Sequence, residues 1–170
     1  MRAFKRFRIY PASSWRNPYY PAVIAALSGA GHDVFDWREH GFSFESIDPG
    51  YKTWSRLEYV EALHSRTADV QFRRDLSAME QCDVCVLILP AGASAHAEAA
   101  WCAAMRKQVL IFLGDANPQP ELLHLLSNGF VEDIKQLLFV LTTTQAGDPD
   151  ADIITIEGYP LAIPGGAWRR

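Results

Sequence analysis

The sequence lacks a long hydrophobic run, a set of paired cysteines and a strong excess of charge of either sign. No apolar stretch reaches the ~20 residues that a membrane-spanning helix requires, and the basic first ten residues lack the apolar run of a secretory signal. Three cysteines are too few, and odd in number, for a disulfide framework. These absences predict a cytoplasmic protein that does not bind a membrane.

Charge and length narrow the class of protein further. The chain has 16 Lys and Arg against 20 Asp and Glu, whereas proteins that coat nucleic-acid polymers normally carry an excess of positive charge. With 49% apolar residues it can form a core, which excludes a disordered chain. Its 170 residues suit one domain, which we expect over residues 1–157. The tail, residues 158–170, is rich in glycine and proline and indicates no particular role.

Patterns typical of strands and helices alternate along the chain. Short apolar runs predict strands at residues 6–12, 32–37, 84–89, 109–113 and 152–156. Helical patterns lie at residues 21–31, 54–81 (broken near Thr67), 94–107, 119–127 and 131–141, and a long loop covers residues 38–53. The alternation predicts an α/β domain with one parallel sheet of about five strands between two layers of helices, a Rossmann- or flavodoxin-like three-layer sandwich. Ligands bind such sheets at the carboxyl ends of the strands.

Glu98 stands out because it is the one carboxylate in an apolar helix. Between residues 91 and 105 only Ser94, His96 and Glu98 are polar or ionisable, so we expect this helix to be buried nearly all round. Burial of an unpaired polar group costs roughly 2–7 kcal/mol, and a charged one costs more. A capping box would need Ser or Thr where Ala95 stands. Because the helix dipole favours an ionised carboxylate near the first turn, Glu98 is a candidate nucleophile.

Asp75 is the second candidate, on the helix that leads into the third predicted strand. Taken alone, it is typical of a solvated residue paired with Arg73 or Arg74. Beside Glu98 it supplies the second carboxyl group that glycosyl transfer commonly uses.

The turn after the first strand is the third candidate element. Ser13, Ser14 and Arg16 place two hydroxyls and a guanidinium where an anion could bind, directly before the start of a helix. A polar surface turn without a ligand is the alternative.

Three segments, in their order and spacing, resemble the nucleoside 2-deoxyribosyltransferase-like family, and most closely its deoxynucleoside 5′-monophosphate N-glycosidases. In YPASSWR, the residues Tyr10, Ser14 and Arg16 match the family's Tyr-x-x-x-Ser-x-Arg pattern. In DLSAMEQCD, Asp75 stands eight residues before an Asp that opens a buried strand. In VLILPAGASAHAEAAW, a strand and a Gly-containing turn precede Glu98, which falls on the family's nucleophile. The resemblance spans about residues 8–126.

The resemblance implies a role for each of these residues. Glu98 would attack C1′ of the sugar and form a glycosyl-enzyme, and Asp75 would help to protonate the leaving base or to place the nucleophile. Tyr10 would line the sugar pocket, while Ser14 and Arg16 would hold a 5′-phosphate. Water or a second base would then release the sugar, giving a hydrolase or a transferase. The resemblance implies a small nucleoside or nucleotide as partner, no cofactor or metal, and a homo-oligomer (a dimer or larger).

The chain departs from the family in the turn before Glu98. The transferases carry an Asp six residues before their Glu, where this chain has Gly92, and its absence argues against base exchange. The nucleotide hydrolases carry Ser at that position, and here Ser94 comes two residues later. Gly92, Ser94 and His96 complete the candidate substrate-binding set, although His96 could instead orient Glu98 or only begin the helix. A nucleotide-binding or sensing module without catalysis is the main alternative.

A serine hydrolase is a further alternative, from a different class. Residues 92–96 resemble a nucleophile elbow with its last glycine replaced, in which Ser94 would act with His124 and Asp115. Glu98 would then have no role.

Other motifs favour structural roles. Cys82 and Cys85 straddle the start of a strand and are typical of buried thiols. No set of His, Asp or Cys residues has a recognised metal-ligand spacing, so no metal site is expected. Four aromatic residues of the long loop and its end could stack on a base, close the loop or contact another subunit: Phe42, Phe44, Tyr51 and Trp54.

Overall fold

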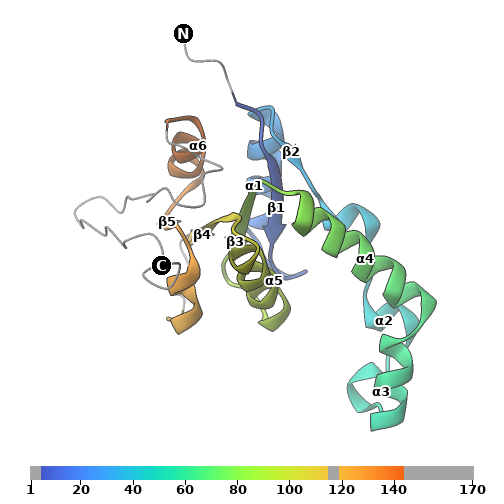
Figure 1. Ribbon diagram of the computed structural model, residues 1–170. Coiled ribbons are helices and arrows are strands. Elements are labelled where there is room, and N and C mark those ends of the chain that lie inside the picture. Colours follow the sequence, from blue (N-terminus) through green and yellow to red (C-terminus); the bar gives the residue numbers. More distant parts are fainter. Residues whose placement is uncertain (1–4, 115–118, 144–170) are drawn as a thin grey trace.

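The computed structural model describes residues 5–114 and 119–143, and its centre is one parallel sheet in the order β2-β1-β3-β4-β5 (Figure 1). The strands are β1 (Arg8–Ala12), β2 (Asp33–Val34), β3 (Val84–Ile88), β4 (Gln108–Phe112) and β5 (Gly129–Val131). Every residue of β3 and β4 is buried, as expected of central strands that are covered on both faces. The predicted α/β class with about five parallel strands is therefore confirmed.

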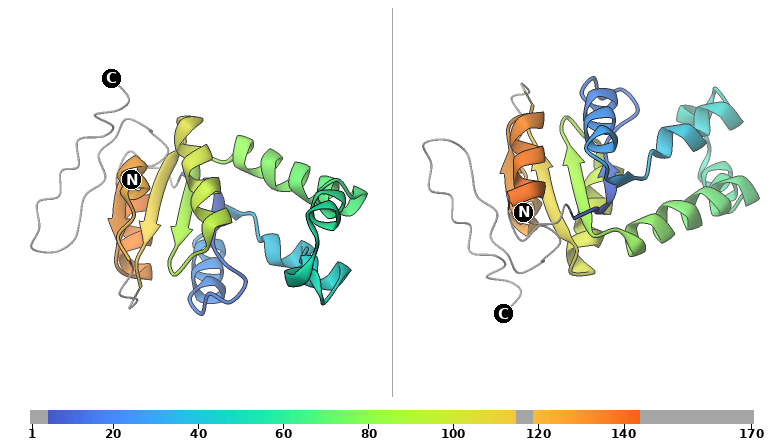
Figure 2. Two further views of the ribbon diagram at one scale, coloured as in Figure 1. Left: turned by 90° about the horizontal axis from the view of Figure 1, so that it is seen from below. Right: turned by 90° about the horizontal axis from the view of Figure 1, so that it is seen from above.

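Helices cover both faces of this sheet, and α1 and α5 lie on opposite sides of it (Figure 2). The helices are α1 (Tyr20–Gly29), α2 (Phe44–Ile47), α3 (Arg56–Leu63), α4 (Arg66–Gln81), α5 (Ala93–Ala104) and α6 (Ile134–Thr143). Successive strand residues point to opposite faces, so Ile9 packs with α1 and α6, whereas Tyr10 packs with α5 and the end of α4. The alternation gives two cores, one on each face.

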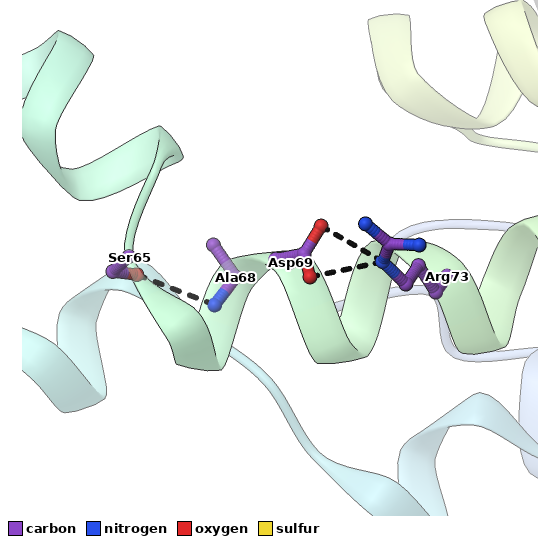
Figure 3. Close-up of polar contacts among 4 residues, drawn as sticks. All are labelled: Ser65, Ala68, Asp69 and Arg73. Carbon is purple, nitrogen blue, oxygen red and sulfur yellow. Dashed lines mark hydrogen bonds and ion pairs between the residues drawn. The ribbon is translucent and has the colours of Figure 1, made fainter.

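Residues 41–73 form an arm that projects from the sheet, with α2 and α3 at its far end (Figure 1). Ala68 is the only buried residue of the arm, all of whose residues the structure describes. The break between α3 and α4 falls at residues 64–65, close to the predicted break. There the Ser65 hydroxyl accepts a hydrogen bond from the Ala68 amide at 3.3 Å and begins α4, and Asp69 then pairs with Arg73 at 2.9 Å (Figure 3). Local polar contacts thus specify the arm's helices.

Several predicted elements differ in the structure. The second strand has two residues rather than six, and the loop of residues 38–53 contains short helical turns at Trp37–His40, Phe44–Ile47 and Tyr51–Thr53. Residues 131–141 begin with the end of β5 rather than with a helix, and residues 119–127 hold only a short 3₁₀ turn, Leu122–Leu126. The strand predicted at 152–156 and the tail lie outside the described residues.

The expected all-round burial of α5 is wrong. Its buried residues, Ala95, Ala99, Cys102 and Ala103, recur at helical spacing and face the sheet. The opposite side is open, with Trp101 43% exposed, because within the described residues nothing packs over it. Among the described helices none is both long and apolar enough to cross a membrane.

Candidate active site

A cavity of about 350 Å³ lies beyond the carboxyl ends of β1 and β3, where the parallel sheet predicts a ligand. It draws on the turn after β1, the turn and helix after β3, one face of α4, and the segment after β2. The lining residues are Tyr10, Ser13, Ser14, Trp15, Trp37, Phe42, Gln71, Asp75, Gly92, Ala93, Ser94, Ala95 and Glu98. Seven of the nine predicted site residues are in this set, and Arg16 and His96 are not.

Glu98 lies in the second turn of α5 and reaches the cavity wall. Burial and the nearby charge of Asp75 raise the pKa of its carboxyl from 4.5 to about 7, although a hydrogen bond from Tyr10 lowers it. The helix dipole led us to expect the ionised form, but burial is the largest influence on the pKa of this carboxyl and favours its protonated form. Near neutral pH, Glu98 therefore exchanges readily between its protonated and ionised forms.

Tyr10 connects β1 to Glu98. Its ring is buried and stacks on Phe35 with 5.7 Å between ring centroids. Burial and the carboxylates of Glu98 and Asp75 raise the pKa of its hydroxyl, so the hydroxyl stays protonated. It can therefore donate a hydrogen bond to Glu98 throughout the physiological pH range.

Asp75 faces the cavity from α4, whereas Glu98 faces it from α5. Its Oδ1 accepts a hydrogen bond of 2.8 Å from Gln71 Nε2, and burial raises the pKa of its carboxyl. Arg73 does not pair with Asp75, because it binds Asp69 instead. Sequence reasoning missed Gln71, although its position four residues before Asp75 on a helix is a recognisable signal. The two carboxyl groups of the cavity thus have different hydrogen-bond donors, Gln71 for Asp75 and Tyr10 for Glu98.

The turn after β1 is fixed by its own polar residues. Ser13 donates to the Ile88 carbonyl at 3.1 Å. Asn17 donates to the carbonyls of Ile88 and Pro90, and its Oδ1 accepts from the first amides of α1 at 2.8 and 3.2 Å. Because Asn17 occupies the amides of Tyr19 and Tyr20, the start of α1 offers an anion fewer free donors than expected. The start of α5 has no such cap: Gly92 precedes it without a side-chain hydrogen bond, at the cavity wall.

Arg38 holds the same turn from outside, and sequence reasoning did not find it. Its Nη2 donates to the carbonyls of Ser14 and Trp15 at 2.9 Å each and of Asn17 at 3.3 Å. Its guanidinium also lies 4.1 Å from the centroid of the Tyr20 ring. Since these acceptors are backbone atoms more than 20 residues away, no residue pattern in the sequence could indicate the contact.

His96 and Arg16 take other positions. His96 donates from Nδ1 to the Gly92 carbonyl at 2.9 Å, and its Nε2 lies 3.2 Å from Nε2 of His124. His124 is thus occupied by His96 rather than by Ser94, which argues against the serine hydrolase, and Asp115 lies outside the described residues. Arg16 is exposed and lines a second cavity beside the first.

The aromatic residues of the predicted loop contact one another, which supports the loop-closing role among the three expected. Phe42 lines the cavity. Phe44 and Tyr51 each pack edge to face with Trp54, with ring centroids 5.8 and 6.1 Å apart, respectively. Phe42 joins this cluster through Phe44, so the loop closes on itself beside the cavity. Within the described residues no group of three or more His, Cys, Asp or Glu could hold a metal ion.

Comparison with solved structures finds proteins with a similar fold. A 2-deoxyribosyltransferase from the psychrotolerant bacterium Bacillus psychrosaccharolyticus matches with a TM-score of 0.56 and 19% sequence identity, over 76% of this chain and 88% of that one. The CMP N-glycosidase BcmB of Clostridium botulinum matches with a TM-score of 0.43 and 20% identity, over 79% of this chain and 96% of that one. No protein-family model and no curated protein matches the chain. The first likeness confirms the fold that the sequence resemblance implied.

Proposed function

We propose that this protein cleaves the N-glycosidic bond of a nucleoside or deoxynucleoside, or of its 5′-monophosphate, with Glu98 as the nucleophile. The observation that carries the proposal is the convergence of Glu98, Asp75 and Tyr10 on one cavity. That cavity opens at the carboxyl edge of a sheet with the fold of a 2-deoxyribosyltransferase. Two carboxyl groups with different surroundings are what glycosyl transfer through a covalent intermediate requires.

In the proposed first step, the Glu98 carboxylate forms a bond to C1′ while the bond from C1′ to the base nitrogen breaks. The electron pair of the broken bond goes to the base, which takes the proton of Asp75. Because burial raises the pKa of both carboxyl groups, each can hold a proton closer to neutral pH than a free acid does. The reactive form has a proton on Asp75. Tyr10 holds the Glu98 carboxylate by its hydrogen bond.

In the second step, a water molecule attacks C1′, returns a proton to Asp75 and releases Glu98. The same position could take a second base, which would make the reaction a transfer. We propose hydrolysis, because Gly92 stands where the resemblance places the transferases' Asp. A 5′-phosphate would lie toward the uncapped start of α5 and Ser94, with Ser14 on the opposite wall. The Ser13 hydroxyl already donates to Ile88, so it contributes less.

The test is release of free base from ribo- and deoxynucleosides and their 5′-monophosphates, followed by chromatography with and without a spare base. We expect Glu98→Gln to lower the rate by more than ~10³-fold. Glu80→Gln, an exposed acid on α4, is the matched control and should leave the rate unchanged. A Glu98→Gln variant as active as the parent would refute the mechanism, and exchanged nucleoside would refute hydrolysis alone.

A binding or sensing module is the second candidate. The missing carboxylate at Gly92 favours it, since the cavity could then hold a nucleotide without turning it over. Saturable binding of a nucleotide by the parent, with no base released over hours, would replace the enzyme by this module.

The expected homo-oligomer remains a proposal. Exposed apolar residues on two elements support it, namely Trp101 on α5 and Leu57 and Val60 on α3, which are 43%, 66% and 48% exposed. Sedimentation of the purified protein tests it, and a monomer at micromolar concentration would exclude it. The cytoplasmic location is likewise proposed, and three buried free cysteines are consistent with a reducing compartment.

A further inference from the structure

A second cavity, of about 590 Å³, adjoins the first and is not used by the chemistry above. The two cavities share Ser14 and Trp15, so they meet at the turn after β1. The remaining wall comes from Arg16 and from the arm: Gly41, Ser43, Glu45, Ser46, Tyr51 and Lys52.

The two cavities differ in charge. The ionisable side chains of the first are Glu98, Asp75 and Tyr10, and no Lys or Arg lines it. The second has Arg16 and Lys52 against a single carboxylate, Glu45. The second cavity therefore has the more positive surroundings of the two and favours an anionic group that extends beyond the first.

The cations of the second cavity are available to a ligand. Arg16 and Lys52 are exposed, and neither forms an ion pair with a described residue, although Lys52 Nζ lies 5.8 Å from the centroid of the Tyr51 ring. By contrast, Arg38 nearby is occupied by three backbone carbonyls and by the Tyr20 ring. A guanidinium and an ammonium together suit a phosphate chain, because the first binds two oxygens at once and the second adapts to several.

Size argues against a single phosphate. The second cavity is larger than the first, which would hold the sugar and the base, whereas one phosphate group is much smaller than a nucleoside. Two cations, one from the turn and one from the arm, also exceed what one phosphate needs.

We infer that the second cavity is a subsite for a phosphate chain of two or more phosphates, so that nucleoside 5′-di- and triphosphates are better substrates than the 5′-monophosphate. This inference rests on the proposed function, whose cavity holds the nucleoside. The chain would leave the sugar past Ser14 and lie between Arg16 and Lys52. A pyrophosphate that links two nucleosides has the same chemistry and would enter the same way.

The test compares kcat/KM for base release along one series with a common base: nucleoside, monophosphate, diphosphate, triphosphate and symmetrical dinucleoside diphosphate. We expect the parent to prefer the di- and triphosphate over the monophosphate by about tenfold or more. Lys52→Gln should remove most of that preference, and Lys135→Gln, an exposed lysine on α6, should keep it. Equal use of mono- and triphosphate, or a preference that survives Lys52→Gln combined with Arg16→Gln, overturns the inference.

Two further outcomes distinguish failure of the subsite from failure of the proposed function. Base release from the nucleoside and monophosphate without preference for a longer chain leaves the proposed function intact and removes the subsite. If no substrate releases base, the proposed function fails, and equilibrium binding to the same protein decides. Tighter binding of the triphosphate than of the monophosphate, weakened about tenfold by Lys52→Gln, then supports the subsite, and equal binding overturns it. If the dinucleoside diphosphate is a good substrate, the second cavity accommodates a second nucleoside as well as the phosphate chain. If it is rejected, the cavity accommodates the phosphate chain alone.

Discussion

The sheet and the arm differ in how far their apolar residues are buried. In the central strands such residues are almost fully buried, for example Leu110 at 0% exposure, whereas Leu57 and Phe72 in the arm are 66% and 61% exposed. The sheet thus carries the folding energy, and the arm is held mainly by caps and by its connection through α4. The first cavity lies where the two regions meet, with Glu98 and Tyr10 from the sheet side and Phe42 and Gln71 from the arm. Chemistry and substrate selection therefore rest on regions of different stability.

The largest expected difference between the regions is in stability. Leu110→Ala should lower the free energy of unfolding by roughly 2–5 kcal/mol, because it leaves a cavity in a close-packed core. Leu57→Ala removes a side chain that is mostly in water and should cost less than about 0.5 kcal/mol. Urea denaturation of both variants measures the difference. Equal losses would show that the arm packs against something in solution, such as a second copy of the chain.

The next difference concerns acidic residues and pH. The pKa of Glu98 is raised to about 7 in the folded state, so the folded protein holds a proton that the unfolded chain loses above about 4.5. The free energy of unfolding should fall by up to about 3 kcal/mol between these pH values, and Glu98→Gln should abolish most of this fall. In the arm, Glu58 has a lowered pKa because it binds Ser55, so its contribution has the opposite sign and is lost as the pH falls. Denaturation of the parent and of Glu98→Gln at pH 4.5, 6 and 8 measures this fall. An equal fall in the free energy of unfolding of both proteins would contradict the assignment.

Two arginines extend the comparison to polar contacts. Arg38→Met should cost about 2 kcal/mol and raise KM, since three backbone carbonyls lose their donor and the turn that carries Ser14 loosens. Arg73→Met breaks an exposed ion pair with Asp69 and should leave the unfolding midpoint nearly unchanged. An Arg38→Met protein with normal stability and normal KM would exclude the proposed support of the turn.

The smallest expected effects are shifts of the pH profile at the junction of the two regions. In the free protein, the charge of an ionised Asp75 raises the pKa of Glu98, so Asp75→Asn should move the acidic limb of kcat/KM to lower pH. Tyr10→Phe removes a hydrogen bond that lowers this pKa, so the limb should move to higher pH. Both variants will also be slower, but only the position of the limb is compared. Shifts in the same direction would show that another group titrates in this range.

The same division explains how much could be predicted from the sequence. The sheet was predictable because an unbroken apolar run such as residues 84–89 suits a strand buried on both faces, and because Glu98 is out of place in its apolar helix. β5 was missed because its three residues merge with the apolar pattern of the helix that follows. The helical turns of the arm were missed because they depend on single caps, such as Ser43.

Site residues were predictable where they carry a chemical signal of their own. Tyr10, Asp75 and Glu98 were found in this way and do line one cavity. Arg38 and Asn17 were not, because their partners are backbone carbonyls and amides brought close only by folding. Arg16, which the resemblance assigned to a 5′-phosphate, lines the adjoining cavity rather than the one that contains Glu98.

The three cysteines, Cys82, Cys85 and Cys102, have a practical consequence. All are free and buried beside the sheet, and none lies in the arm. A thiol-specific reagent will therefore modify the protein only when the sheet region opens, whatever the arm does. The labelling rate, measured by mass spectrometry, therefore reports the opening of the sheet region alone. A nucleotide that lowers the labelling rate binds to the closed form of the sheet region, so the same reagent can also screen for ligands.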